Sequence, residues 1–175
     1  MSLLLLVDGY NVVAPVAPPA GRADPKWLQR ERMQLLQRLV EFLDAETRSR
    51  TCVVFDAANP PPDRPDQFQF HGIEVRFAID YPEADDLLEE LIAAHSAPKT
   101  LAVVSSDHRV QAFAKRRGSL ALDSQAWLDD LLESRVILAV RPKRKEQGNR
   151  DDEDRKPPQK NDDQDVEGWM REFGF

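Results

Sequence analysis

The segment LLLLVDGYNVV, residues 3–13, gives the clearest indication of the fold class, because it is an apolar run that ends abruptly on a carboxylate. Its aliphatic residues, bounded by Gly9, predict a short buried strand. The run is too short to cross a membrane, and it lacks the basic start and cleavage site of a secretory signal. Strands buried on both faces are typical of parallel sheets in α/β proteins, which bind ligands at the carboxyl ends of their strands. We therefore expect Asp8 at a ligand-binding edge.

The composition predicts one folded domain with some length to spare. Of the 175 residues, 41% are hydrophobic, which supports a packed core, whereas 13 prolines and 31% charged residues predict unfolded segments. The single cysteine, Cys52, allows no internal disulfide, and with no export signal we expect a cytoplasmic protein without a membrane partner. The net charge of −7 argues against a generally basic nucleic-acid-binding surface. A polyanionic substrate would therefore need local basic patches or bound cations.

Apolar runs alternate with amphipathic stretches along residues 1–140, which predicts an α/β fold with a mainly parallel sheet flanked by helices. The Pro-rich stretch 58–71 predicts an exposed loop, and the role of RVILAV at 135–140 stays open. We place a helix cap at Ser124. The further predicted strands are 51–57, 72–78, 100–107 and 119–122, and the predicted helices are 24–47, 83–95, 107–117 and 124–134.

The composition changes after residue 140. Residues 141–165 lack the large apolar side chains that a core needs, so we interpret them as a disordered, charged linker. In residues 166–175 the side chains of Trp169, Met170 and Phe173 share one face of a predicted short helix. Such a motif docks either on the body of the protein or on a partner, and we favour a partner or the ribosome.

Acidic residues follow several of the predicted strands. Because the carboxyl ends of parallel strands lie at one edge of a sheet, these side chains are expected to converge there. Converging carboxylates repel each other unless their pKa values rise or a cation binds, and an oxygen-rich cluster suits Mg²⁺ or Mn²⁺. Such ions can activate water for attack on a phosphodiester. The acids concerned are Asp8, Asp56, Glu83, Asp85, Asp86 and Asp107.

Helix geometry ranks the acids that open the helix 83–95. At 100° per residue, Asp85 lies at one margin of the buried face and Glu83 at the other, while Asp86 points to the polar side. We therefore favour Asp85 as a metal ligand, with Asp86 as a helper. Asn11 either orients water or phosphate beside Asp8 or is a turn residue. Aspartates at helix starts also act as caps, an alternative that stays open for Asp107.

Taken together, VDGYN, VVFDA, EADD and VVSSD resemble the YacP-like subgroup of NYN-domain proteins, which are PIN-like nucleases. The resemblance covers about residues 1–140 and leaves the tail from Arg141 to Phe175 outside. It implies a Rossmann-like PIN fold, metal-dependent cleavage of RNA and an action on mRNA at the ribosome. It also implies ligand roles for Asp8, Asp85 and Asp107; the supporting residues would be Asp86, as a further ligand, Asn11, Asp56 and Glu83.

Two basic clusters are candidate phosphate contacts for RNA. The first could equally be a favourable cationic end of a helix, and the second a solvated linker. Tyr10 either stacks on a base or packs over its loop. The competing hypothesis is a non-catalytic RNA- or ribosome-binding module with a vestigial acidic pocket; the intact acid set and the low positive charge argue against it. The clusters are Lys115, Arg116 and Arg117, and Arg141, Lys143, Arg144 and Lys145.

Overall fold

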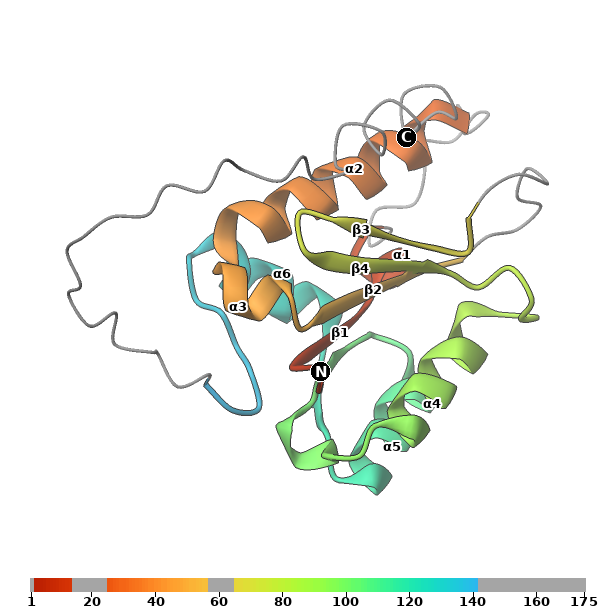
Figure 1. Cartoon of the computed structure of the whole chain (residues 1–175), viewed down its shortest axis with the longest axis vertical. Coiled ribbons are helices and arrows are strands. Elements are labelled where there is room, and N and C mark those ends of the chain that lie inside the picture. Colours follow the sequence, from red (N-terminus) through yellow and green to blue (C-terminus); the bar gives the residue numbers. More distant parts are fainter. Residues whose placement is uncertain (1, 14–24, 57–64, 142–175) are drawn as a thin grey trace, which may run out of the picture.

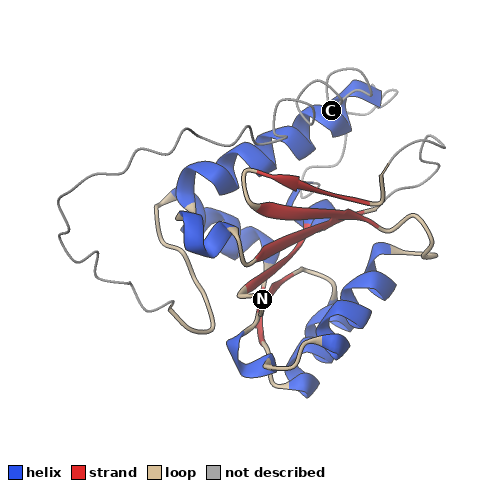
Figure 2. Ribbon diagram, viewed as in Figure 1, coloured by secondary structure: helices blue, strands red, loops and turns tan. Residues whose placement is uncertain are grey.

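A six-stranded sheet with the order β3-β4-β2-β1-β5-β6 forms the centre of the protein (Figures 1 and 2). The computed structural model describes residues 2–13, 25–56 and 65–141. All neighbouring strands are parallel except β3 and β4, so the predicted α/β class with a mainly parallel sheet is confirmed. The strands are β1 (Leu5–Asp8), β2 (Thr51–Phe55), β3 (Gln67–Phe70), β4 (Ile73–Phe77), β5 (Ala102–Val104) and β6 (Leu120–Leu122).

Helices cover both faces of the sheet (Figure 1). Helices α1, α2 and α6 pack against one face, and α4 and α5 against the other. A short α3 and the 3-10 helix η1 (Pro98–Thr100) connect elements at the rim. The helices are α1 (Gly9–Val13), α2 (Pro25–Phe42), α3 (Ala45–Arg48), α4 (Ala84–Ala94), α5 (His108–Arg117) and α6 (Ser124–Leu132).

The central strand β1 explains the apolar run at the start of the chain. Leu5 and Val7 belong to the core under α2 and α6, whereas Leu6 belongs to the core under α4 and α5. Because successive side chains point to opposite faces, a strand covered on both sides must be apolar at every position. The buried pattern continues through Asp8, which thus stands at the carboxyl end of the strand.

The structure corrects the reading of 58–71 as an exposed loop, because residues 67–70 form the edge strand β3. β3 turns back on β4 through His71 and Gly72, which both have positive φ. Phe70 is buried in the core and Phe68 lies against it. The alternation QFQF carried a strand signal, which the neighbouring prolines obscured.

Two further expectations change at helix ends, and the structure answers the open question about the segment RVILAV. The predicted helix 24–47 is broken after α2, and a new turn, α3, starts at the cap Asp44. Helix α6 is capped by Asp123 rather than by Ser124, which is its first residue. The segment RVILAV forms no strand; residues 136–139 lie partly buried against the core that α2 and α6 cover.

Several predictions fall on residues that the structure does not describe. Lys143, Arg144 and Lys145, most of the linker 141–165 and the whole motif 166–175 lie outside the described residues. Within the described part of the chain, no helix is long and apolar enough to span a membrane.

Candidate active site

Asp8 is a buried carboxylate held by three donors. Its side chain ends β1 and is 1% exposed. Oδ2 accepts hydrogen bonds from the Ser105 hydroxyl at 2.7 Å and from Asn11 Nδ2 at 2.5 Å, and Oδ1 accepts one from the Asn11 backbone amide at 3.2 Å. Buried polar groups are as a rule hydrogen-bonded, and these three bonds together fix the orientation of the carboxylate. Asn11 therefore orients the Asp8 carboxylate, instead of acting only as a turn residue.

Ser105 connects the two sides of this edge, and the sequence analysis missed it. Its hydroxyl is fully buried; besides donating to Asp8, it accepts from the Asp107 amide at 3.1 Å and from Asn11 Nδ2 at 3.3 Å. The pairing of β1 with β5, which sets Val7 opposite Val104, brings Ser105 beside Asp8. The Ser105 hydroxyl does not titrate, so the pattern of acidic residues did not include it. The available signal was its position near the carboxyl end of the predicted strand 100–107, two residues before Asp107.

Asp107 caps helix α5. Its carboxylate accepts hydrogen bonds from the backbone amides of Arg109 at 2.7 Å and Val110 at 3.1 Å. The capping alternative considered for this residue is therefore correct as far as local structure goes. Capping uses one carboxylate oxygen, so it leaves the other oxygen for a second role.

Asp85, in the first turn of α4, shares its surroundings with the other acids. Burial raises its pKa to about 6, together with the negative charges of Asp107, Asp8 and Glu83, and Arg109 opposes the rise. These acids come from three separate segments of the chain. Their mutual repulsion shows that the strand ends and the start of α4 gather excess negative charge at one edge of the sheet.

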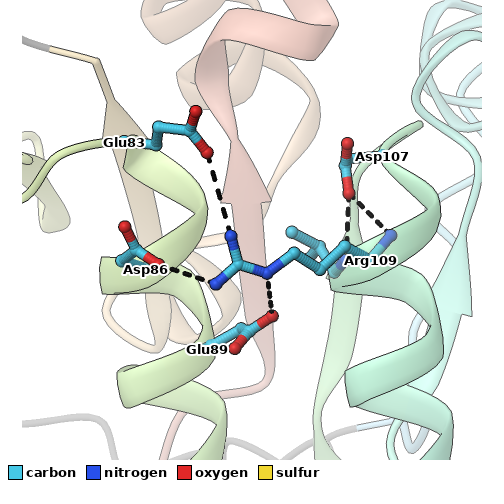
Figure 3. Close-up of polar contacts among 6 residues, drawn as sticks. Glu83, Asp86, Glu89, Asp107 and Arg109 are labelled. Carbon is cyan, nitrogen blue, oxygen red and sulfur yellow. Dashed lines mark hydrogen bonds and ion pairs between the residues drawn. The ribbon is translucent and has the colours of Figure 1, made fainter.

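Arg109 fastens α5 to α4 beside this cluster (Figure 3). Its guanidinium donates to Asp86 Oδ1 at 2.7 Å and to Glu89 Oε1 at 2.8 Å, and lies 3.8 Å from Glu83 Oε2. Asp86 and Glu83 thus face a cation on α5, whereas the negative charges of Asp107 and Asp8 act on Asp85. Exposed ion pairs contribute little to stability. The main effect of these bonds is on position, because they link Asp86, which is next to Asp85, to Arg109, which is two residues after Asp107.

Asp56 lies on the other flank of the carboxyl edge. Its backbone carbonyl accepts a hydrogen bond from Arg32 Nη2 at 2.7 Å. The Arg32 guanidinium lies 5.3 Å from the ring centre of Phe55 and 5.6 Å from that of Phe77. Burial lowers the pKa of Arg32, and the charge of Asp56 partly offsets this. These contacts join Asp56 to α2 rather than to Asp8.

The glycine after Asp8 allows α1 to start directly on the strand end. A Cβ on Gly9 would lie 2.3 Å from a ring carbon of Phe55, so no larger residue fits without displacing that ring. A short helix, α1, thus begins directly after Asp8, and Asn11 lies in this helix. Tyr10 is 50% exposed, which does not agree with packing over the loop.

The described basic candidates lie away from the acids. Lys115, Arg116 and Arg117 form the last turn of α5, roughly 12–15 Å along the helix from Asp107 at 1.5 Å per residue. Arg117 donates to the carbonyl of Ala93 at 2.9 Å, and the Arg116 guanidinium lies 5.4 Å from the Phe113 ring centre. Arg116 and Arg117 thus contact the body of the protein at the end of the helix, the position that the cationic-end alternative describes. Arg141 is exposed.

The donor set at this edge fits a divalent cation. Mg²⁺ and Mn²⁺ prefer carboxylate oxygens, and a cation would relieve the repulsion that raises the pKa of Asp85. As the side chains stand, no group of three or more His, Cys, Asp or Glu residues in the described ranges is close enough to hold an ion. Asp8, Asp85 and Asp107 would therefore have to draw together around a bound ion.

Comparisons with known proteins agree with this architecture. Two crystal structures of Rae1 (YacP) from Bacillus subtilis match the chain with a TM-score of 0.56, one of the protein itself at 26% identity and one of a tryptophan-to-leucine mutant at 25%. Each covers 77% of this chain, which spans 75% and 77% of the respective Rae1 chains. No curated protein matches the sequence.

The family profile described as the YacP-like NYN domain matches residues 5–171. The match runs through the linker 141–165 and into the motif 166–175, so the expectation that the tail lies outside the family resemblance is wrong. NYN domains are typically nucleases. This chain belongs to the YacP-like NYN domain family.

Proposed function

We propose that the protein is a metal-dependent endoribonuclease that hydrolyses phosphodiester bonds of mRNA at the ribosome. The proposal is supported by the position of Asp8, Asp85 and Asp107 at one edge of the sheet, where the charges of Asp107 and Asp8 help to raise the pKa of Asp85. Ser105 bonds both to the Asp8 carboxylate and to the Asp107 amide, and Arg109 bridges to Asp86, next to Asp85. Family membership supports the nuclease class, and the resemblance to the YacP-like group supports an action at the ribosome. The single cysteine supports the proposed cytoplasmic location.

Asp8, Asp85 and Asp107 are the proposed ligands of Mg²⁺ or Mn²⁺, with Asp86 as a further one if it leaves Arg109. When bound at such a site, a divalent ion lowers the pKa of an attacking water and stabilises the charge on the leaving oxygen. Hydrolysis of this type needs no side-chain nucleophile. The protein's task is then to fix the carboxylates and to position the RNA.

The chain's own residues divide this task. Asn11 and Ser105 hold the Asp8 carboxylate in one orientation. Asp85 ionises above a pH of about 6, the value to which its surroundings raise its pKa. Arg109 keeps the starts of α4 and α5 in register. Binding of a metal would therefore also depend on Asn11, Ser105 and Arg109, which contact no metal themselves.

Substrate contacts are proposed at some distance from the acids. Tyr10, half exposed and two residues after Asp8, can stack on a base. Lys115, Arg116, Arg117 and Arg141, with the undescribed Lys143, Arg144 and Lys145, would contact phosphates of RNA that extends along α5. Trp169, Met170 and Phe173, also undescribed, are the proposed contacts to the ribosome or to a protein partner.

The test is incubation of the purified protein with translating ribosomes and Mn²⁺, followed by mapping of new RNA ends. We expect defined new ends with the wild type and with Asp129→Asn, which changes an exposed carboxylate on α6. We expect none with Asp85→Asn. Ribosome binding without new ends in the wild type would favour the non-catalytic binding module and contradict the proposal.

A further inference from the structure

A cleft of about 380 Å³ opens between the end of β4 and the start of α4. Its apolar lining includes the buried Leu87 and the partly exposed Tyr81. The Tyr81 hydroxyl donates to Glu90 at 2.8 Å, which fixes the ring against α4. The cleft thus has room and a flat apolar surface for a planar group.

The cleft lies beside the acidic cluster. Arg76, which lines it, is in register with Val54 on β2, and Val54 is in register with Asp8 on β1. Their side chains share one face of the sheet, and two strand spacings separate Arg76 from Asp8 by about 10 Å. Leu87 and Asp85 lie two residues apart near the start of α4, about 3 Å along the helix axis. A strand of RNA that crosses the start of α4 can reach both the cleft and the acids.

Among the described residues that line the cleft, the charged ones are Arg76, Asp66 and Asp80. Arg76 Nε donates to Glu74 Oε1 at 2.5 Å. A guanidinium has five N–H donors, so its two terminal nitrogens can serve a ligand. Asp66 and Asp80 line the same cleft and are exposed. This set offers a donor fork together with carboxylate acceptors.

We infer that this cleft binds one base of the RNA next to the cleaved bond, and that the base is guanine; the inference rests on the proposed function. Two carboxylates beside Arg76 make the cleft unfavourable for a phosphate. A base can lie on the ring of Tyr81 and present its edge to the polar groups. Guanine offers adjacent acceptors, O6 and N7, to an arginine fork, and N–H donors to a carboxylate.

The experiment measures binding, not cleavage, so it is independent of whether the wild type cleaves. Short single-stranded RNAs that differ at one position are titrated against the full chain carrying Asp85→Asn. Guanine at that position is expected to bind on the order of 5- to 150-fold more tightly than the other bases. Arg76→Lys, which keeps the charge but loses the fork, should remove this preference. Lys99→Ala, in the exposed η1 turn, should preserve it.

Changes on the RNA side test the site with the protein unaltered. Replacing the guanine by 7-deazaguanine, which lacks N7, or by inosine, which lacks the exocyclic amine, should each weaken binding several-fold. Equal affinity for all four bases, or a guanine preference that persists in Arg76→Lys, would overturn the inference. A wild type that shows the preference but cleaves no RNA would contradict the proposed function and leave this site standing.

Discussion

The starts of α5 and α6 are built alike but differ in their surroundings. Each helix follows a strand at the same edge of the sheet, and each is capped by an aspartate. Asp107 accepts from the amides two and three residues ahead, and Asp123 does the same with Gln125 and Ala126. Judged by local structure, the two aspartates have the same role.

Their neighbours separate them. The amide of Asp107 is bonded to Ser105, whose hydroxyl holds Asp8, and the charge of Asp107 helps to raise the pKa of Asp85. The amide of Ala126 and the hydroxyl of Ser106 lower the pKa of Asp123. A helix cap is therefore no evidence against a functional role; the accumulation of like charge around it distinguishes the candidate site.

The largest effect is expected when one of the proposed metal ligands is replaced. Asp8→Asn or Asp85→Asn removes a charged ligand, so RNA cleavage should fall by more than the roughly 10- to 100-fold typical of a residue that only supports a ligand. Rate measurements on a fixed RNA with Mn²⁺ check this, with circular dichroism to show that the fold is intact. A folded variant that cleaves at the wild-type rate would remove that residue from the site.

The next prediction replaces each of the two capping aspartates by asparagine. Asparagine caps helices about as well as aspartate, so Asp107→Asn and Asp123→Asn should each change the free energy of unfolding by less than about 1 kcal/mol. Cleavage should fall strongly only in Asp107→Asn. Equal cleavage by the two variants would mean that Asp107 is a cap and nothing more.

A smaller effect is expected at the hydroxyls next to the two caps. Ser105→Ala removes a donor to Asp8 and should cost about 1–3 kcal/mol of stability and roughly 10- to 100-fold in cleavage. Ser106→Ala, which loses the bond to Asp123, is the matched control and should cleave like the wild type. If both variants cleave alike, Ser105 does not position Asp8 for catalysis.

The smallest effect concerns stability against pH. Because the folded pKa of Asp85, about 6, lies above the ordinary 3.8, the group's stabilising contribution is complete below about pH 4 and is lost as the pH rises through 6. Asp85→Asn should therefore be more stable than the wild type at pH 7.5, and this difference should vanish near pH 3.5. Denaturant unfolding at both pH values measures it; an unchanged difference would contradict the raised pKa.

Local patterns in the sequence predicted the elements that depend on neighbouring residues. The apolar run ending at Asp8, the amphipathic α4 and the end of α5 at Arg117 all follow from short-range rules. Asp85 was predicted at the margin of the buried face of α4, and in the structure its side chain is partly buried.

What the sequence concealed depends on contacts between distant segments. Ser105 becomes important only because β5 pairs with β1, and Arg109 only because α5 packs beside α4. The strand β3 depends on pairing with β4 across a two-residue turn. Neither strand register nor the partner of a long side chain is encoded in the residues next to it.

Anomalous scattering from crystals of the full chain grown with Mn²⁺ and a non-hydrolysable RNA analogue tests the central claim most directly. We predict a manganese peak coordinated by oxygens of Asp8, Asp85 and Asp107, next to an RNA phosphate. RNA bound at this edge with no manganese peak among these three side chains, or with the peak elsewhere, would contradict the account.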